Sequence, residues 1–463
     1  MPEDLTVLVF GPGAREHVLT DAYERSRRVK KIVVAPGNDF IGFRRKKEVV
    51  IDANCDLKDV DSMLAIAEKY RPDLIDVAQD DAIATGVGDM LRQKGFTVFC
   101  PSHKASRIEW DKVWSRNFMA RHGIPTPEFH TFSSPHLAEK FLDTFYKDRP
   151  HRLAFVKAAG LAAGKGALKA TSYQEAVGCV MRMSTFGNAG STFLIEPGLC
   201  GHEFSLFAIS DGENYYRFKP SRDYKRALDF DEGEQTGGMG TVASLHTLEQ
   251  REKTLGSPLR DAEQVLLKRV ITGMANDGTP YQGILYAGGM FVPSPDDPYD
   301  DYPPFCIEYN ARWGDPEAQV ILPGFTGDYA ELVLAACEGK LKDILYDIVP
   351  DVDELEDHKY RVCVVGASRG YPGNYSAVRG KRIYGIENAL QVNGVTIYSA
   401  AIDVVDGRFY ANGGRLFSIV GEGKDVAEAR ERAYHAMALI GVEGNNLHYR
   451  TDIGVEEVEI ITK

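Results

Sequence analysis

The stretch Leu153-Ala-Phe-Val-Lys157-Ala-Ala-Gly-Leu-Ala-Ala-Gly-Lys-Gly166 joins an apolar run to a glycine-dense loop. A lysine at the end of a buried strand is costly without an anionic partner, and small loop residues let phosphates approach the backbone. No Ser or Thr follows the Gly-Lys pair, so the stretch is not a Walker loop. We interpret it as a flexible phosphate lid; a glycine hairpin with a solvated lysine is the alternative.

The residues around this loop complete a small structural unit. Apolar runs predict strands at 153–157, 167–170 and 192–196, and the pattern at 173–183 predicts a helix. Together they indicate a compact α+β unit. The breaker cluster Gly123-Ile-Pro-Thr-Pro127 precedes it and marks the end of a first domain.

The chain begins with strands that alternate with helical patterns. Strands are predicted at 6–10, 31–35, 74–77 and 96–100, with a helix from about residue 15, which indicates parallel βαβ units. The turn Phe10-Gly-Pro-Gly-Ala-Arg-Glu-His17 can present backbone N–H groups to a phosphate. A dinucleotide fingerprint would need a third glycine where Glu16 stands, so NAD binding is disfavoured. A tight turn without a ligand is the alternative.

The segment Phe305-Cys-Ile-Glu-Tyr-Asn-Ala-Arg-Trp-Gly-Asp-Pro-Glu317 combines carboxylate, amide and guanidinium groups. With the period of two of a strand, Glu308, Asn310 and Arg312 share one face, and the intervening residues 307, 309 and 311 face the core. A carboxylate and an amide oxygen suit Mg²⁺, and a guanidinium suits a carboxylate or phosphate. We therefore expect a metal and anion site; a solvated sheet face is the alternative.

Further strands are predicted on both sides of that segment. Between 202 and 330, apolar runs at 204–209, 284–292 and 305–309 indicate a larger sheet, interrupted by the polar stretch 229–240. After residue 331, strands are expected at 361–365, 395–399 and 414–420, and a helix at 425–439. Lys112, the segment 194–199 with Glu203, and the segments 221–226 and 236–240 are weak site candidates when taken singly.

Composition limits the classes of function. A chain of 463 residues exceeds one hydrophobic core, so several domains with clefts between them are expected. The net charge of −13 disfavours binding to nucleic acid, whose backbone is also negatively charged. The first residues do not resemble a signal peptide and no apolar run is long enough for a membrane span, so we expect no membrane association and a cytoplasmic location. Seven dispersed cysteines argue against disulfides or a zinc site.

Taken in order, the motifs resemble those of the phosphoribosylamine–glycine ligase family over essentially the whole chain. Each motif is weak, but eight in the same order make a chance match negligible. The matching segments are Gly11 to His17, Ala35 to Asn38, Arg121 to Thr126, Lys157 to Gly166, Thr236 to Gly240, Leu285 to Gly288, Glu308 to Glu317 and Gly370 to Gly373.

The resemblance implies a multi-domain ATP-grasp architecture that mixes α/β and α+β parts. The domains expected from it are an N-terminal phosphate- and substrate-binding βαβ domain (1–125), a small lid (126–196), a central domain with the metal site (197–330) and a C-terminal domain (331–463). It also implies an ATP- and Mg²⁺- or Mn²⁺-dependent enzyme that joins glycine to phosphoribosylamine in purine biosynthesis. A monomer or homodimer is expected.

The resemblance further implies roles for individual residues. Arg312, Lys157 and Asp223 are the expected catalytic residues, and Glu308 and Asn310 the expected metal ligands. The residues expected to bind ATP are Lys112, Lys157, Gly164, Lys165, Gly166, Glu196, Leu199 and Glu203. The residues expected to bind the other substrates are Gly11, Gly13, Arg15, Glu16, His17, Asp223, Gly237, Gly238, Arg312 and Asp315.

Departures from the family pattern lie near the substrates. The family's GPEAPL is replaced by Ala78-Gln-Asp-Asp-Ala-Ile83, its PNTGGMG by residues 234–240, its EEFL by residues 196–199 and its FHAGT by residues 398–402. A ligase with a changed amine or amino acid is therefore an alternative hypothesis. A non-catalytic nucleotide-binding regulator is a third, which the presence of Lys157, Glu308 and Arg312 disfavours.

Overall fold

The computed structural model describes residues 4–162, 164–243, 258–294, 302–348 and 355–462. The first sheet is fully parallel, with the order β3-β2-β1-β4-β5. Its strands are β1 (Leu5–Gly11), β2 (Val29–Pro36), β3 (Glu48–Ile51), β4 (Leu74–Val77) and β5 (Val98–Phe99). The predicted βαβ organisation is confirmed.

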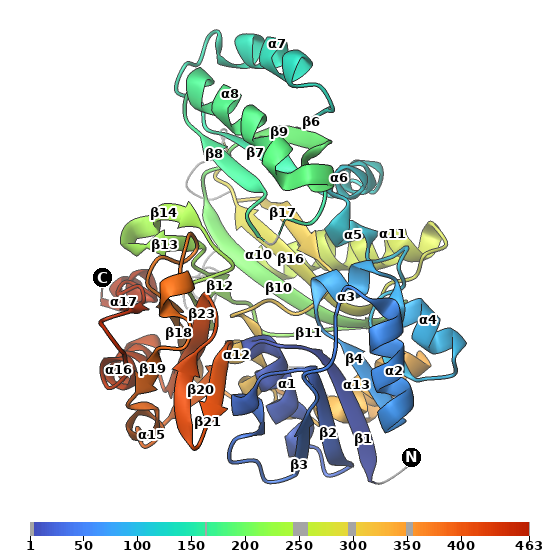
Figure 1. Ribbon diagram of the computed structural model, residues 1–463. Coiled ribbons are helices and arrows are strands. Elements are labelled where there is room, and N and C mark those ends of the chain that lie inside the picture. Colours follow the sequence, from blue (N-terminus) through green and yellow to red (C-terminus); the bar gives the residue numbers. More distant parts are fainter. Residues whose placement is uncertain (1–3, 163, 244–257, 295–301, 349–354, 463) are drawn as a thin grey trace.

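Helices cover both faces of this sheet. Along β1, Val7 and Val9 belong to one buried cluster and Leu8 and Phe10 to another, because successive side chains of a strand point to opposite faces. The helices are α1 (Ala14–Arg25), α2 (Val60–Tyr70), α3 (Asp80–Ala84) and α4 (Val87–Gln93). The first of them begins directly after β1, at the edge where the glycine turn lies (Figure 1).

A second unit, called the lid unit (residues 130–197), projects from the molecule and carries the glycine-dense loop (Figure 1). It is an antiparallel sheet of order β6-β9-β7-β8. Its elements are β6 (His130–Phe132), β7 (Ala154–Ala158), β8 (Ala167–Ala170), β9 (Phe193–Pro197), α7 (Pro135–Tyr146), α8 (Tyr173–Arg182) and a 3₁₀ segment (Met183–Gly190). The short helices α5 (Arg107–Trp110) and α6 (Lys112–Arg121) lead into it.

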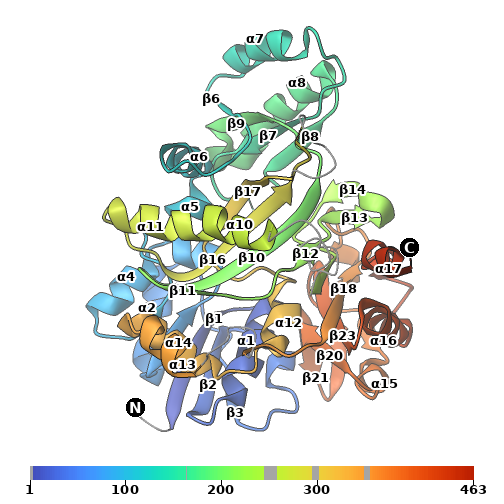
Figure 2. The same cartoon turned by 180° about the vertical axis from the view of Figure 1, so that it is seen from behind.

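A long antiparallel sheet of order β11-β10-β16-β17 lies between the lid unit and the N-terminal unit. Its strands are β10 (His202–Asp211), β11 (Tyr215–Arg217), β16 (Gln282–Phe291) and β17 (Pro304–Asn310). Figure 2 shows α10 (Pro258–Ala262) and α11 (Arg269–Asn276) across its back, joined by a π-helical segment (Glu263–Lys268). The helices that follow are α12 (Ala318–Ile321), α13 (Tyr329–Glu338) and α14 (Leu341–Ile348).

The C-terminal part contains two further sheets. The larger has the order β12-β15-β18-β23-β20, with β25 also paired to β18, and the smaller the order β21-β22-β19-β24. The larger sheet consists of β12 (Arg222–Asp223), β15 (Gly240–Ala243), β18 (Tyr360–Ser368), β20 (Val395–Ser399), β23 (Arg415–Gly423) and β25 (Leu447–His448). The smaller consists of β19 (Arg382–Tyr384), β21 (Ile402–Val405), β22 (Arg408–Ala411) and β24 (Gly441–Val442), and the helices are α15 (Ile386–Ala389), α16 (Val426–Ala438) and α17 (Val455–Thr462).

The polar stretch 229–240, predicted to interrupt a sheet, is itself structured. It contains a 3₁₀ turn (Asp229–Asp231) and β14 (Glu232–Gln235), which forms a hairpin with the preceding β13 (Arg226–Leu228), and β15 begins at its end. Because β12 pairs with β15, and β15 pairs with the C-terminal strand β18, the chain on both sides of residue 330 contributes to one sheet. The four-domain division stays a proposal. Within the described residues, none of the helices has the length and apolar character needed to cross a bilayer.

Candidate active site

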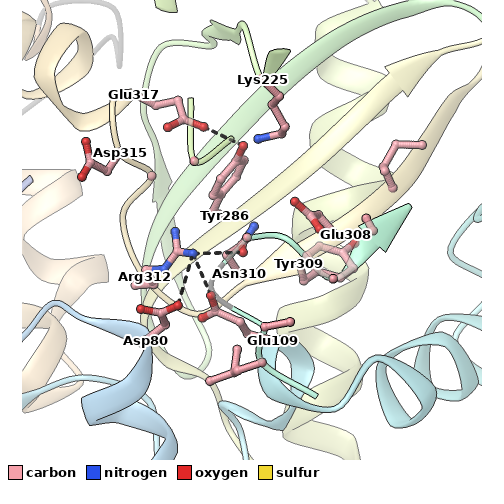
Figure 3. A pocket seen from close by; sticks show the side chains of 18 of the residues that line it. Asp80, Glu109, Lys225, Tyr286, Glu308, Tyr309, Asn310, Arg312, Asp315 and Glu317 are labelled. Atoms are coloured by element: carbon pink, nitrogen blue, oxygen red, sulfur yellow. Dashed lines mark hydrogen bonds and ion pairs between the residues drawn. The ribbon is translucent and has the colours of Figure 1, made fainter. Parts of the chain in front are cut away.

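A cavity of about 470 Å³ opens where the N-terminal sheet, the lid unit, the central sheet and the C-terminal sheet meet. Its walls are densely charged (Figure 3). The expected site residues that line it are Gly13, Arg15, Glu16, Lys112, Lys157, Gly164, Gly166, Glu196, Gly237, Glu308, Asn310, Arg312 and Asp315. Those that do not line it are Gly11, His17, Lys165, Leu199, Glu203, Asp223 and Gly238.

Lys157 is the penultimate residue of β7, is buried, and has the anionic partner that its burial requires. Its Nζ lies 2.7 Å from Glu196 Oε2, and Arg116 on α6 approaches the same carboxylate with Nε at 2.6 Å from Oε1. Burial opposes ionisation of Glu196, but the two cations outweigh it and lower the pKa of Glu196 to about 2. The carboxylate is therefore ionised at neutral pH.

Glu308 and Asn310 both line the cavity, as the strand pattern predicts. Burial opposes ionisation of Glu308, but Lys225, Lys157 and Lys112 together lower its pKa. An ionised carboxylate two residues from an amide oxygen is a donor pair suited to a hard cation that keeps waters and phosphates as its other ligands.

The predicted alternation along 305–312 is wrong in two respects. The pairing of β16 with β17 shifts register, so that Gly288 pairs with Glu308 and Gly289 with Cys306. This bulge leaves Ile307 unpaired and turns it into the cavity, while Cys306 enters the core instead. In addition, β17 ends at Asn310, so Arg312 projects from the loop beyond the strand rather than from its face.

Arg312 lies among carboxylates from the N-terminal part of the chain (Figure 3). Its NH2 is 3.0 Å from Glu109 Oε1 and 3.9 Å from Asp80 Oδ2, and it donates to Asn310 Oδ1 at 3.4 Å. Its Nε is buried and has no hydrogen-bond partner within the described protein. A cavity-lining guanidinium with a donor still free is suited to an anionic substrate group.

The glycine turn at the start of α1 already holds a carboxylate. Glu16 Oε2 accepts a hydrogen bond from the Gly13 backbone N–H at 2.7 Å, and its Oε1 lies 2.7 Å from Arg15 Nε. Gly11 has a φ of +147°, and a Cβ there would lie 2.4 Å from Glu16. His17 faces away from the cavity, and its Nδ1 accepts from the Ser399 backbone N–H at 2.9 Å.

The loops of residues 236–240 and 314–317 are held by the C-terminal sheet. Arg415 NH2 on β23 lies 3.0 Å from Asp315 Oδ2, and its NH1 donates to the Gly237 carbonyl at 3.1 Å. Asp223 lies behind Gly238 and pairs with Lys225, but its Oδ1 is buried without a partner in the described protein.

Of the remaining expected residues, Lys112 lines the cavity, whereas Lys165, Leu199 and Glu203 do not. Lys165 is exposed and donates to the Pro372 carbonyl at 2.9 Å, so the lid loop contacts the C-terminal part of the chain. Leu199 is half-buried and Glu203 is exposed, both beside the cavity-lining Glu196 segment. Lys112 donates to the Gly160 carbonyl at 3.4 Å and lies inside the cavity.

Sequence reasoning missed several charged residues of the cavity wall. They are Glu109, Arg116, Lys225, Glu317 and Arg415. Glu109, Lys225 and Glu317 stand close to Lys112, Asp223 and Asp315, and this position inside the candidate segments is the signal that could have found them. For Arg116 and Arg415 the sequence carries no such signal, because their partners are distant along the chain.

The fold and the cavity define an ATP-grasp ligase. Two lobes, the lid sheet and the long central sheet, enclose a cavity with lysines on one side and Glu308 and Asn310 on the other. The chain is similar in fold to the biotin carboxylase domain of 2-oxoglutarate carboxylase from Hydrogenobacter thermophilus, with a TM-score of 0.68, 13% identity and coverage of 97% of this chain and 92% of that chain.

The chain belongs to the phosphoribosylglycinamide synthetase family. The models of its N domain, ATP-grasp (A) domain and C domain match residues 5–109, 110–318 and 361–456. A phosphoribosylamine–glycine ligase of Caldanaerobacter subterraneus is 36% identical over 97% of this chain and 99% of its own length. The crystal structure of phosphoribosylamine–glycine ligase from Thermotoga maritima matches with a TM-score of 0.74 at 27% identity, covering 97% of this chain and 100% of that chain.

Proposed function

We propose that the protein ligates glycine to 5-phosphoribosylamine at the expense of ATP, through glycyl phosphate, and releases glycinamide ribonucleotide, ADP and phosphate in purine biosynthesis. The observation that carries the proposal is the single cavity where Lys157 and Lys112 face Glu308, with Arg312 alongside. The names of full-length relatives support the choice of substrates.

ATP is expected along the lid side of the cavity. Lys112 and Lys157 would hold its phosphates, and the backbone of Gly164 to Gly166 would cover them. Glu196, Leu199 and Glu203 form the segment that joins the two lobes, which suits the adenine and ribose. The chain has a net charge of −13, which repels a polyanion such as ATP. The local cluster of lysines is therefore needed to attract its phosphates.

Mg²⁺, or Mn²⁺ in its place, is the proposed metal. Glu308 and Asn310 are only two protein ligands, and among the described residues no cluster of three or more His, Cys, Asp or Glu side chains could hold an ion. That donor set fits a metal which takes its other ligands from ATP and water. When bound, the metal would neutralise charge on the transferring phosphoryl group. The biotin carboxylase domain with the related fold was solved with magnesium and ADP.

The acceptor substrates are expected opposite the lid. Arg312 would bind the glycine carboxylate. Asp223 would bind an amine only after the loop at Gly238 moves, because its partnerless Oδ1 is buried behind that loop and does not line the cavity. Gly237, Gly238 and Asp315 would complete this wall. The 5-phosphate of phosphoribosylamine would lie by the turn formed by Gly11, Gly13, Arg15, Glu16 and His17. For a phosphate oxygen to accept from the Gly13 N–H and from Arg15, Glu16 must first release both donors.

The reaction proceeds in two steps that need no enzyme nucleophile. A glycine carboxylate oxygen attacks the γ-phosphorus of ATP, the bond to ADP breaks, and glycyl phosphate forms while Lys157 and Lys112 stabilise the equatorial charge. The amine of phosphoribosylamine then attacks the acyl carbon, loses a proton and expels phosphate. Closure of the lid loop shields the intermediate from water.

A second candidate differs only in the amine or amino acid. Asp80, within the altered segment 78–83, lines the cavity and faces Arg312 at 3.9 Å. A carboxylate at that position is able to change which amino acid or amine is accepted, because it alters the charge beside the guanidinium that would bind the carboxylate substrate.

The test is ADP release with MgATP, glycine and freshly generated phosphoribosylamine, with each omitted in turn. The proposal expects release only when all are present, and replacing either acceptor with other amines or amino acids should lower kcat/KM. Full turnover with another amine and none with phosphoribosylamine would favour the second candidate. ATP binding without turnover on any acceptor would indicate a regulator. The cytoplasmic location and the monomer or homodimer state stay predictions.

A further inference from the structure

The lid unit has its own hydrophobic core. Its buried cluster contains Leu142, Val156, Phe193 and Ile195 and is separate from the clusters of the central and N-terminal sheets. Polar side chains therefore make an important part of the connection between the lid and the strand that bears Glu308. Arg116 on α6 is the most extensively bonded of these among the described residues that line the cavity.

Arg116 is 3% exposed and its guanidinium reaches two sheets at once. On the lid side it forms a fork with Glu196, with Nε to Oε1 at 2.6 Å and NH2 to Oε2 at 2.9 Å. On the other side NH2 donates to the Ile307 carbonyl at 2.8 Å and NH1 to the Cys306 carbonyl at 3.4 Å. NH1 also donates to Thr126 Oγ1. This planar arrangement of donors is specific to arginine.

The two carbonyls that Arg116 binds belong to the bulge of β17. Ile307 is unpaired there and Glu308 follows it directly. Because the bulge decides which residues of β17 face the cavity, a guanidinium bonded to its carbonyls fixes the position of Glu308. On the lid side, the same group shares the Glu196 carboxylate with Lys157.

The charges of Arg116, Lys157 and Glu196 explain why it matters that the two cations share one carboxylate. Arg116 and Lys157 carry two positive charges and Glu196 one negative charge, so the buried group has a net charge of +1. Without Arg116 the carboxylate and Lys157 would neutralise each other and hold each other in a tight pair. With it, Glu196 is compensated by the guanidinium fork and the charge of Lys157 remains available to a triphosphate.

We propose that Arg116 is a positioning residue for ATP: it compensates Glu196 so that Lys157 can bind phosphate, and it holds the bulge that places Glu308 where it would hold the metal for the same phosphates. The inference rests on the proposed function only in that Lys157 and Glu308 serve ATP. It does not depend on which acid and amine are joined.

The test is the Kd of ATP with Mg²⁺, measured by calorimetry without acceptor substrates, in R116M, R116K and R116M/E196Q. R116M removes one positive charge and should raise the Kd by about tenfold or more. R116K keeps the charge and should stay closer to the wild type. R116M/E196Q restores the net charge of +1 and should recover much of the affinity lost in R116M. R121M is the matched control, since Arg121 on the same helix pairs with Asp277 at the surface.

A purely structural role predicts a different pattern. R116M would then lower the melting temperature, the double variant would be no better than R116M in ATP affinity, and R116K would not rescue. Either that pattern or an unchanged Kd in folded R116M overturns the proposal. Failure of the proposed function is distinguishable, because wild-type protein would bind MgATP with the expected dependence on Arg116 but would not release ADP with glycine and phosphoribosylamine.

Discussion

Buried ionisable side chains set the properties of the cleft at the scale of single residues. Lys157 and Glu308 lie on different sheets. Lys157 pairs with Glu196 at 2.7 Å, and the surrounding lysines lower the pKa of Glu308 against the effect of burial. Glu317 behaves differently: burial raises its pKa to about 7, and its Oε1 accepts a hydrogen bond from Tyr286 at 2.7 Å (Figure 3). The cleft thus contains carboxylates of unlike acidity.

Replacing Glu308 with alanine should reduce metal-dependent ADP release by about a hundredfold or more, because one of the two proposed protein ligands of the metal is lost. The measurement is ADP release against Mg²⁺ concentration. Glu387→Ala, an exposed change on α15, is the control and should leave the rate unaltered. Near-normal turnover in folded Glu308→Ala would reject the metal assignment.

Asp76 on β4 links pH to stability. Burial raises its pKa to about 7, and the hydrogen bond from Tyr23 at 2.8 Å only partly opposes this. A raised pKa means that the fold favours the protonated acid, so stability falls as pH rises from about 4 to about 7. Asp76→Asn keeps an acceptor for Tyr23 and removes this cost. Relative to the wild type it should be more stable at pH 8 than at pH 5 by about 2 kcal/mol.

Urea unfolding at the two pH values measures this difference. Asp52 is the comparison, because Lys69 leads the interactions that lower its pKa to about 2. The ionised Asp52 carboxylate therefore stabilises the fold at neutral pH, and this stabilisation is lost as pH falls toward 2. Asp52→Asn should accordingly be destabilising at pH 8. An equal effect of Asp76→Asn at both pH values would mean that Asp76 is not protonated in the fold.

At the scale of elements, the turn before α1 and the bulge in β17 determine which side chains face the cavity. Long apolar runs made most strands predictable from the sequence: β4 matches its predicted bounds, and β1, β7 and β9 differ by a residue at their ends. The bulge could not be predicted, because it arises from pairing with β16 rather than from residues 305–312 themselves. The very short β12 likewise has no periodic signal.

Gly11→Ala should destabilise the protein by about 2 kcal/mol or more, because its backbone is strained for an L residue and the new Cβ meets Glu16 at 2.4 Å. Gly178→Ala is the matched control. It lies in α8 with no atom near the added Cβ, so it should be neutral or stabilising by up to about 1 kcal/mol. Thermal unfolding compares the two. Equal stability of both variants would contradict the close approach at Gly11.

The molecule as a whole consists of a lid with its own core mounted on a body whose sheets share buried clusters. This division follows from the local apolar pattern of residues 153–196, so the lid unit was predictable. The contacts that bring the walls of the cavity together could not be predicted from the sequence. Arg116 meets Glu196 across 80 positions and Glu109 meets Ala311 across 202, distances over which one sequence carries no pairing information.

Binding of MgATP should slow amide hydrogen exchange in peptides that contain Gly164, Lys165 and Gly166, because phosphates and the Lys165 contact with Pro372 would hold the loop closed. Peptides from α16 lie away from the cleft and serve as the internal control. The effect should disappear in Glu308→Ala. Protection that is equal with and without nucleotide would contradict closure of the lid.

The central claim is that the cleft joins a carboxylate to the γ-phosphoryl group of ATP before the amine attacks. Glycine labelled with ¹⁸O in its carboxylate tests this directly, with mass spectrometry of the phosphate released during turnover with phosphoribosylamine. The account predicts one labelled oxygen in each phosphate, because that oxygen leaves with the phosphoryl group when the amide forms. Phosphate without label, together with normal amide formation, would contradict it.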